Sequence, residues 1–327
     1  MKNPTFEFFR ITERDILSTR LGVVNHIKSR STSLHGGAEA LIRKRLLTTE
    51  TPALGELIPW LLADLFNLDN TAVKEIATAW LKVYLYTCFI DDALDENKRL
   101  VPSEALAASI LFQEGSATLF KLVANTRYEE ILRSSFYVAA EGELLDIEEQ
   151  SSISDHKIIS AEKKNFVFLA CAAALAAQAD QKGERIIEFS EAILLGLQYL
   201  DDIADWEHDY SLGNHTKLLS DAFQIISAGK GKLHRAELLR VLVLSGALSS
   251  LLRETTQIIE KGVLVAIQNV ESNTSAGGLF LLTLLDLVKS AETVVMEAER
   301  QLHLPACNDH MVLGRVENIL KKIAQSS

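Results

Sequence analysis

Two aspartate-rich segments could carry chemistry, because their spacing gathers several carboxylates on one side of a helix. Residues 91–95 read Asp-Asp-Ala-Leu-Asp, and residues 201–205 read Asp-Asp-Ile-Ala-Asp. On a helix, the aspartates of either segment span roughly 100° of arc. Each segment follows an apolar stretch that we expect to be core. Clustered anions beside a core are costly unless something positive neutralises them.

Divalent cations are the expected partners of these carboxylates. Hard cations take oxygen ligands, and Mg²⁺ often combines one or two carboxylates with waters and substrate phosphates. Two facing segments would clamp Mg²⁺ around a diphosphate, which lets a chain of net charge −11 bind an anion. One such segment is equally typical of a solvated acidic helix end, whereas two favour a metal site. The predicted metal ligands are Asp91, Asp92, Asp95, Asp201, Asp205 and Asp209, the last of which continues the four-residue spacing of the second segment.

The elements that position the two segments are predicted to be helices. Apolar residues recur at steps of three and four along most of the chain, and no stretch alternates with period two for long enough to predict a strand. The breaks between helices are short, so neighbouring helices should pack antiparallel. We predict an all-α bundle, a single large domain over residues 1–327, with apolar central helices around a cavity. The predicted helices are Thr71–Ile90, Ser103–Val123, Tyr128–Glu149, Ile158–Ala179, Glu184–Asp209, Ala236–Leu264 and Gly278–Leu302.

Composition and charge argue against several other classes of protein. The sequence has no obvious basic face, so nucleic acid is not expected as a partner. Cys88, Cys171 and Cys307 are far apart and form no C-x-x-C pair, so neither a disulfide framework nor a zinc site is expected. The longest apolar run, residues 166–177, is too short to span a bilayer, and the first residues contain no signal-peptide core. These features predict a cytoplasmic protein without stable membrane insertion.

Further positions give the chain a resemblance to the class I isoprenoid synthase superfamily, which comprises isoprenyl diphosphate synthases and class I terpene synthases. Both acidic segments resemble the family's two metal-binding motifs, and Gln198 precedes the second as it does there. Residues 142–146, which contain Glu143, resemble the family's G-(E/Q)-x-x-D segment, and Lys164-Asn165 stands where the family carries Lys-Thr. The order and spacing agree over about residues 56–216.

The resemblance implies an all-α isoprenoid synthase fold and a prenyl diphosphate substrate. It implies about three Mg²⁺ ions, with Mn²⁺ as the alternative metal, held by the two acidic segments. It assigns Lys164 to the diphosphate. Many relatives are dimers, so a homodimer is compatible with the resemblance, and the oligomeric state stays open. The expected catalytic residues are Asp91, Asp92, Asp201 and Lys164.

Departures from the family pattern decide between its branches. Chain-elongating members carry a G-G-K-R-x-R-P segment for isopentenyl diphosphate, whereas residues 53–59 read Ala-Leu-Gly-Glu-Leu-Ile-Pro. The paired arginines after the first motif correspond poorly to Lys98-Arg99, and the Gly-Lys after the second motif is Gly213-Asn214. A second diphosphate needs cationic donors of its own. The pattern therefore favours a class I terpene synthase, a lyase that ionises one linear prenyl diphosphate and cyclises or rearranges the carbocation.

Three alternatives stay open beside the terpene synthase. The first is a prenyltransferase, or isoprenyl diphosphate synthase, that joins an allylic diphosphate to isopentenyl diphosphate or to another acceptor. The second is a catalytically silent partner subunit of a prenyl synthase, against which the complete acidic segments argue. The third is a di-iron helical bundle, which would need Glu-x-x-His pairs that we do not find.

The pocket for the prenyl chain should lie one to two helical turns before each acidic segment. An allylic cation needs a dry apolar cavity, and aromatic faces stabilise it. In the family, bulk four or five residues before the first motif shortens the pocket, which assigns that part to Tyr86. Each of these side chains is also compatible with simple core packing. The predicted substrate-binding residues are Tyr84, Thr87, Cys88, Phe166, Leu194, Leu197 and Gln198, together with Lys164.

Overall fold

The fold is known from a computed structural model. It describes residues 4–30, 36–41, 43, 54–95, 101–148, 165–212, 216–226, 233–267, 275–304 and 308–325. Every regular element within these ranges is a helix, which confirms the predicted all-α class. None of the helices so described combines the length and the apolarity that a membrane crossing needs.

Helices make up most of the described chain. The first five are α1 (Pro4–Arg30), α3 (Leu54–Phe66), α4 (Asn70–Asp95), α5 (Pro102–Val123) and α6 (Glu129–Glu148). The central part contains the 3-10 turn η2 (Asn165–Val167), α8 (Phe168–Ala177), the 3-10 turn η3 (Asp180–Lys182) and α9 (Gly183–Ala204). The last part contains α10 (Trp206–Leu212), α11 (Lys217–Ile226), α12 (Arg235–Leu244), α13 (Ala247–Ala266), α15 (Ala276–Leu302) and α16 (Asp309–Ala324).

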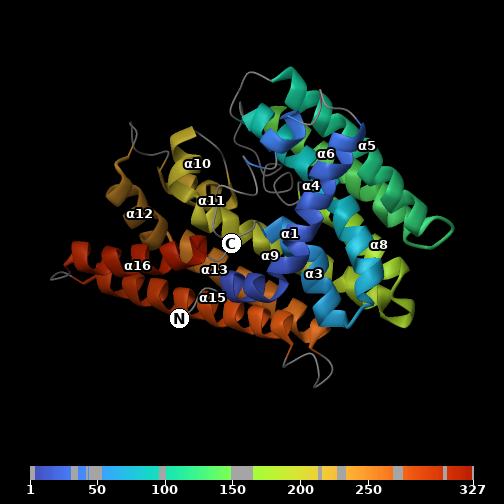
Figure 1. Ribbon diagram of the computed structural model, residues 1–327. Coiled ribbons are helices and arrows are strands. Elements are labelled where there is room, and N and C mark those ends of the chain that lie inside the picture. The colour runs from blue at the N-terminus through green and yellow to red at the C-terminus, as the bar shows by residue number, and fades with distance from the viewer. Residues whose placement is uncertain are drawn as a thin grey trace.

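Helix α9 lies in the middle of the molecule. Figure 1 shows α4, α5, α6 and α8 on one side of it and α10 to α16 on the other. Helix α8 packs against α9 and also against α3, α4, α5 and α6. Residues 169–176 of α8 are all buried, as expected for a helix that is apolar all round. Its many alanines leave room for neighbouring helices, so α8 is the central helix of this side of the bundle.

Helices α3 and α4 form an antiparallel hairpin, so the start of α3 lies beside the second half of α4. The fully buried Trp80 donates its indole N–H to the carbonyl of Gly55 over 2.7 Å. A Cβ atom at Gly55 would lie 2.5 Å from Cε2 of Tyr84 and 2.8 Å from Cε1 of Phe168. Only glycine allows this approach of α3 to α4 and α8.

The predicted helix Ile158–Ala179 has a 3-10 turn at Asn165–Val167 before α8, and its residues 158–164 lie outside the described part. Two other predicted helices are each divided into two helices. The predicted helix Glu184–Asp209 ends as α9 at Ala204, and Asp205 is its C-terminal cap before α10 begins. The predicted helix Ala236–Leu264 is interrupted at Gly246, whose φ of 76° is left-handed and favours glycine. The apolar period continues across both interruptions, so helical periodicity alone does not reveal them.

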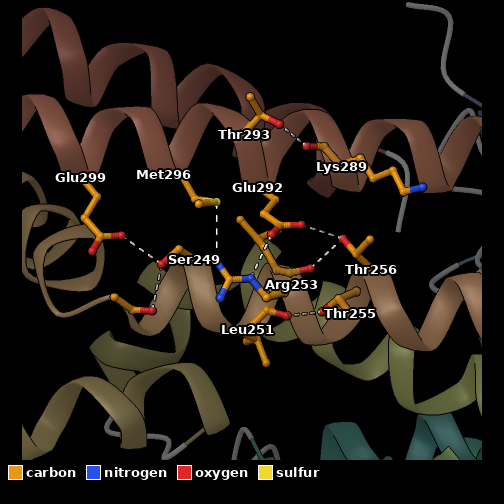
Figure 2. Close-up of polar contacts among 12 residues, drawn as sticks. Ser249, Leu251, Arg253, Thr255, Thr256, Lys289, Glu292, Thr293, Met296 and Glu299 are labelled. Atoms are coloured by element: carbon orange, nitrogen blue, oxygen red, sulfur yellow. Dashed lines mark hydrogen bonds and ion pairs between the residues drawn. The ribbon is translucent and has the colours of Figure 1, made fainter.

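A row of polar contacts joins α13 to α15 (Figure 2). The Ser249 hydroxyl lies 3.1 Å from Oε2 of Glu299, and Arg253 Nε donates to Oε1 of Glu292 over 3.2 Å. Thr256 lies one turn further along α13, 3.4 Å from the other oxygen of Glu292. Because these pairs recur along both helices, they set the register of α15 on α13.

Candidate active site

Each acidic segment lies at the C-terminal end of a long helix. The backbone of Asp91, Asp92 and Asp95 forms the last turns of α4, and the side chains of these residues lie outside the described part. In the second segment, the side chains of Asp201 and Asp205 are exposed. The structure thus places Asp201 and Asp205, two of the predicted metal ligands, at the exposed C-terminal end of α9.

The start of α8 shows that the two acidic helix ends lie at the same end of the bundle. The ring of Phe168, the first residue of α8, has its centroid 6.2 Å from that of Tyr84, which lies about two turns before Asp91 on α4. Asn165, just before α8, donates to Oε1 of Gln198, close to the end of α9. Lys164 directly precedes Asn165 and itself lies outside the described residues. The chain therefore brings the ends of α4 and α9 and the residue Asn165 to one region.

A chain of hydrogen bonds runs behind this region. Asn165 Nδ2 donates to Oε1 of Gln198 over 2.8 Å, and Gln198 Nε2 donates to Oδ1 of Asp202 over 2.9 Å. The backbone N–H of Lys217 donates to Oδ2 of Asp202 over 3.3 Å. Lys217 is the first residue of α11, where free N–H groups and the helix dipole favour an anion. Gln198 thus binds protein groups on both sides of its amide.

The aspartates at four-residue spacing keep that spacing across the break after α9. The N–H of Asp205 donates to the carbonyl of Asp201 over 2.9 Å, and the N–H of Asp209 donates to that of Asp205 over 3.0 Å. Asp209 lies in α10 and is half-buried, unlike the other two. The backbone of the three aspartates therefore keeps helical i to i+4 hydrogen bonds through the break, while their side chains differ in exposure.

The predicted pocket residues lie along the inner parts of α4, η2 and α9. Tyr84, Thr87 and Cys88 are half-buried, as is Phe166, and Leu194 is buried. The Thr87 hydroxyl donates to the carbonyl of Tyr84 over 2.8 Å, so it is satisfied by its own helix.

Two aromatic side chains that the sequence analysis did not single out join this wall. Phe168 packs against Trp80 at 5.4 Å between ring centroids, and both rings contact that of Tyr84. The sequence holds one signal for this cluster, the glycine at position 55, whose missing side chain leaves room for the rings.

Tyr86 lies on another side of α4 and packs against α5. Its ring centroid is 4.5 Å from that of Phe112, which in turn lies 5.5 Å from that of Phe136 of α6. The residue expected to limit the pocket is therefore backed by aromatic rings from two further helices.

A buried ion pair joins α1 to the first turn of α3. Arg20 Nε and Nη2 each lie 2.6 Å from an oxygen of Glu56, and the two residues are only 6% and 4% exposed. Burial raises the pKa of the Glu56 carboxyl, while the hydrogen bonds and charge of Arg20 oppose this rise. Glu56 lies in the 53–59 segment, where the elongating branch of the family carries cations. Sequence reasoning missed this pair, because its members are 36 residues apart.

The described residues contain no group of three or more His, Cys, Asp or Glu side chains placed to hold a metal ion. They do supply exposed oxygen donors at Asp201 and Asp205, the ligand type that Mg²⁺ prefers. The carboxylates of residues 91–95, the carboxylate of Glu143 and the lysine at 164 lie outside the described part. Metal ligation therefore stays a prediction, and the donors that are described are chemically suited to it.

Comparison with known proteins identifies the fold. No protein-family model and no curated protein matches the sequence. A polyprenyl synthase from Caulobacter crescentus, solved with calcium and isoprenyl diphosphate, superposes with a TM-score of 0.66 at 19% identity, over 86% of this chain and 97% of its own. A geranylgeranyl pyrophosphate synthetase from Geoglobus acetivorans gives 0.63 at 19% identity, over 84% and 98% of the two chains. A heptaprenyl diphosphate synthase from Staphylococcus aureus gives 0.63 at 13% identity, over 86% and 98%. The chain therefore has the all-helical fold of the isoprenyl diphosphate synthases, the class I isoprenoid synthase fold that its sequence resemblance implies.

Proposed function

We propose that this protein is a divalent-metal-dependent enzyme that ionises an allylic prenyl diphosphate and transfers the prenyl group to an acceptor. The observation that carries the proposal is the meeting of both acidic helix ends around the start of α8, where Asn165 contacts Gln198 and Phe168 contacts Tyr84. The solved structures that share the fold are prenyl synthases. Prenyl transfer is favoured over the terpene synthase activity that the sequence pattern suggests, because those neighbours are prenyltransferases and not lyases.

The metal in this proposal is Mg²⁺, with Mn²⁺ as the alternative. Asp201 and Asp205 would hold it from α9, and the aspartates of residues 91–95 would hold it from α4. When bound, it supplies Lewis-acid stabilisation of the charge that develops on the departing diphosphate. The Caulobacter polyprenyl synthase was solved with calcium and isoprenyl diphosphate, which supports a divalent metal and a substrate of this class.

The protein's own side chains bind the substrate and keep water from it. Lys164 would bind the diphosphate through its ammonium group. The buried face of α8 and the rings of Tyr84 and Phe168 would enclose the prenyl chain. In such a dry cavity an allylic cation is protected from water, and aromatic faces stabilise it by cation–π attraction.

A terpene synthase is the second candidate, and the Arg20–Glu56 pair favours it. An acceptor diphosphate near the first turn of α3 would meet a buried ion pair in which Arg20 is already bound by two carboxylate oxygens. Such a surface has little to offer a second anion. It suits an internal double bond of the same substrate, or an uncharged acceptor, as the partner of the cation.

One product analysis separates these functions. The protein is incubated with Mg²⁺ and geranyl, farnesyl or geranylgeranyl diphosphate, with and without isopentenyl diphosphate. A longer diphosphate supports the transferase, and a hydrocarbon or alcohol from one substrate supports the lyase. Absence of turnover in every mixture, with an intact helical circular dichroism spectrum, would contradict both and favour a silent partner subunit.

A further inference from the structure

Asp202 differs from its neighbours in the second acidic segment. Its side chain is buried with 2% exposed, whereas Asp201 and Asp205 are exposed. We infer that Asp202 is a positioning residue and not a metal ligand. It ties the end of α9 to the start of α11 and, through Gln198, to the residue next to Lys164. The inference rests on the proposed function, because it assigns Asp202 a role in binding the diphosphate.

Both oxygens of Asp202 bind protein groups. Oδ1 accepts from Gln198 over 2.9 Å, and Oδ2 accepts from the backbone N–H of Lys217 over 3.3 Å. With 2% of the residue exposed, Asp202 leaves no open approach for a metal ion with its waters. Rotating the carboxylate outward would deprive the Gln198 and Lys217 donors of their acceptor, which is more costly than the net worth of each bond.

The N-terminus of α11 is held from a second direction, which fixes the donor that Asp202 uses. The Lys217 ammonium lies 3.0 Å from Oε2 of Glu254 on α13, and 5.0 Å from the centre of the Tyr199 ring. The Lys217 side chain is therefore held by α9 and α13, and its backbone N–H stays directed at Asp202. This N–H and the dipole at the start of α11 favour the negative charge of the buried Asp202 carboxylate.

On its other side, Asp202 orients the lysine segment. The carbonyl oxygen of Gln198 accepts a hydrogen bond of 2.8 Å from Asn165, and its amide nitrogen donates a hydrogen bond to Asp202. Asp202 thereby selects the orientation of the Gln198 amide, and this amide holds Asn165. Lys164 is the adjacent residue, about 3.8 Å away along the chain between Cα atoms. The hydrogen-bond chain consequently fixes the position of Asn165 relative to the end of α9.

The chain of side-chain amides allows a sharp distinction between Asp202→Asn and Asp202→Ala. With asparagine, the new amide oxygen can accept from Lys217, and the amides of Gln198 and Asn165 can rotate by half a turn to keep every bond. With alanine, the Lys217 N–H and the Gln198 amide lose their acceptor. Rescue by asparagine is therefore expected of a positioning residue, whereas at a metal ligand the lost negative charge would weaken metal binding.

Calorimetric titration of the full chain with inorganic pyrophosphate and Mg²⁺ tests the inference. We expect Asp201→Asn to weaken binding by more than about tenfold, and Asp202→Ala by about tenfold as a supporting residue. Asp202→Asn should stay within about threefold of wild type. Circular dichroism and thermal unfolding verify that each variant is folded before it is compared.

A second comparison uses Asn165→Ala. If Asp202 acts through Gln198 and Asn165, then Asn165→Ala combined with Asp202→Ala should bind pyrophosphate no more weakly than Asp202→Ala alone, within about twofold. If the loss of pyrophosphate affinity in the double variant equals the product of the losses in the two single variants, the inference is overturned.

The remaining outcomes are decisive as well. A folded Asp202→Asn protein that loses binding as severely as Asp201→Asn would make Asp202 a ligand and overturn the inference alone. Wild-type affinity in Asp202→Ala would do the same. A wild-type protein that binds no pyrophosphate with Mg²⁺ would overturn the proposed function, and the inference with it.

Discussion

Asp201 and Asp202 are adjacent in the sequence, and their side chains meet opposite environments. Asp201 is exposed at the end of α9, while Asp202 points inward to Gln198 and the start of α11. Their different exposure follows from the helix, which turns successive residues by about 100°. The motif therefore combines a residue that can reach a metal with one that holds the helix in place.

Replacing Asp201 tests the metal site at the scale of one residue. Asp201→Asn should lower turnover of a prenyl diphosphate by at least about 10²-fold, because a carboxylate ligand that stabilises the developing charge is lost. Far-ultraviolet circular dichroism should be unchanged, since the side chain is exposed. The matched control is Asp286→Asn, which removes an exposed carboxylate from α15 and should leave turnover within about twofold. Equal activity in the two variants would refute the metal assignment.

Tyr86 carries a prediction about product length. Tyr86→Ala should remove the ring that packs against Phe112, enlarge the pocket and shift the products to longer chains. Tyr86→Phe keeps the ring and should give wild-type products. Chromatography of the dephosphorylated products measures the shift. An unchanged distribution in a folded, active Tyr86→Ala protein would show that the ring only packs the α4–α5 contact.

At the scale of elements, the first turn of α3 is where α1, α4 and α8 meet. The Arg20–Glu56 pair fastens it to α1, and Gly55 lets it approach the rings of Tyr84 and Phe168. The aromatic wall of the candidate pocket therefore depends on the position of this turn. Both features can be tested through the free energy of unfolding.

The buried ion pair predicts a strong difference between single and double replacements. Arg20→Met or Glu56→Leu alone should lower the free energy of unfolding by about 3–5 kcal/mol, because each leaves an uncompensated buried charge. The double variant should recover most of this loss, since two apolar side chains of similar size replace the pair. Urea unfolding measures all three. A double variant as unstable as the sum of the single ones would contradict the explanation.

Gly55 predicts a steric effect at the same turn. Gly55→Ala should destabilise the protein by about 1–3 kcal/mol, because the new Cβ overlaps the Tyr84 and Phe168 rings. Gly314→Ala is the matched control, since Gly314 lies in α16 with open space around its Cα. Alanine there should stabilise the helix by about 0.5–1 kcal/mol. Thermal unfolding should therefore shift in opposite directions for the two variants.

The elements show what sequence patterns can and cannot predict. Helices α4, α5, α6 and α15 follow the predicted ranges closely, because a buried stripe imposes a period on the sequence. The breaks at Asp205 and Gly246 escape prediction, since the apolar period continues through them. The two acidic segments could be recognised from spacing, whereas the burial of Asp202 depends on Lys217, which only the fold brings to it. The Arg20–Glu56 pair likewise follows from the packing of α1 on α3.

Across the whole molecule, the described helices contribute to two clusters of buried residues. One large cluster of buried residues includes side chains from α1 to α16, and a second, smaller cluster lies between α1, α4 and α5. Tyr84 packs against both clusters, and α4 contributes buried residues to each. This sharing is the physical reason to expect the two clusters to unfold together.

The single-domain organisation stays a prediction, which calorimetry can test. We expect one cooperative transition with equal calorimetric and van't Hoff enthalpies, since α9 packs against both α8 and α13, and α15 packs against α1 and α3. Two separate transitions would divide the chain into independent folding units and contradict the prediction.

Helices α4 and α9 both end with their acidic segments, and neither has a basic residue in its last turn. The C-terminus of a helix carries about half a negative charge of its own, so this end of the bundle repels anions before any carboxylate is counted. A bare diphosphate therefore has an electrostatic reason to stay away, and a cation has one to enter. Each would raise the affinity of the other by the same factor, so metal and substrate would load as a cooperative unit. In the cell, the activity of such an enzyme would depend on the product of the metal and substrate concentrations. This dependence would follow from the direction in which α4 and α9 run.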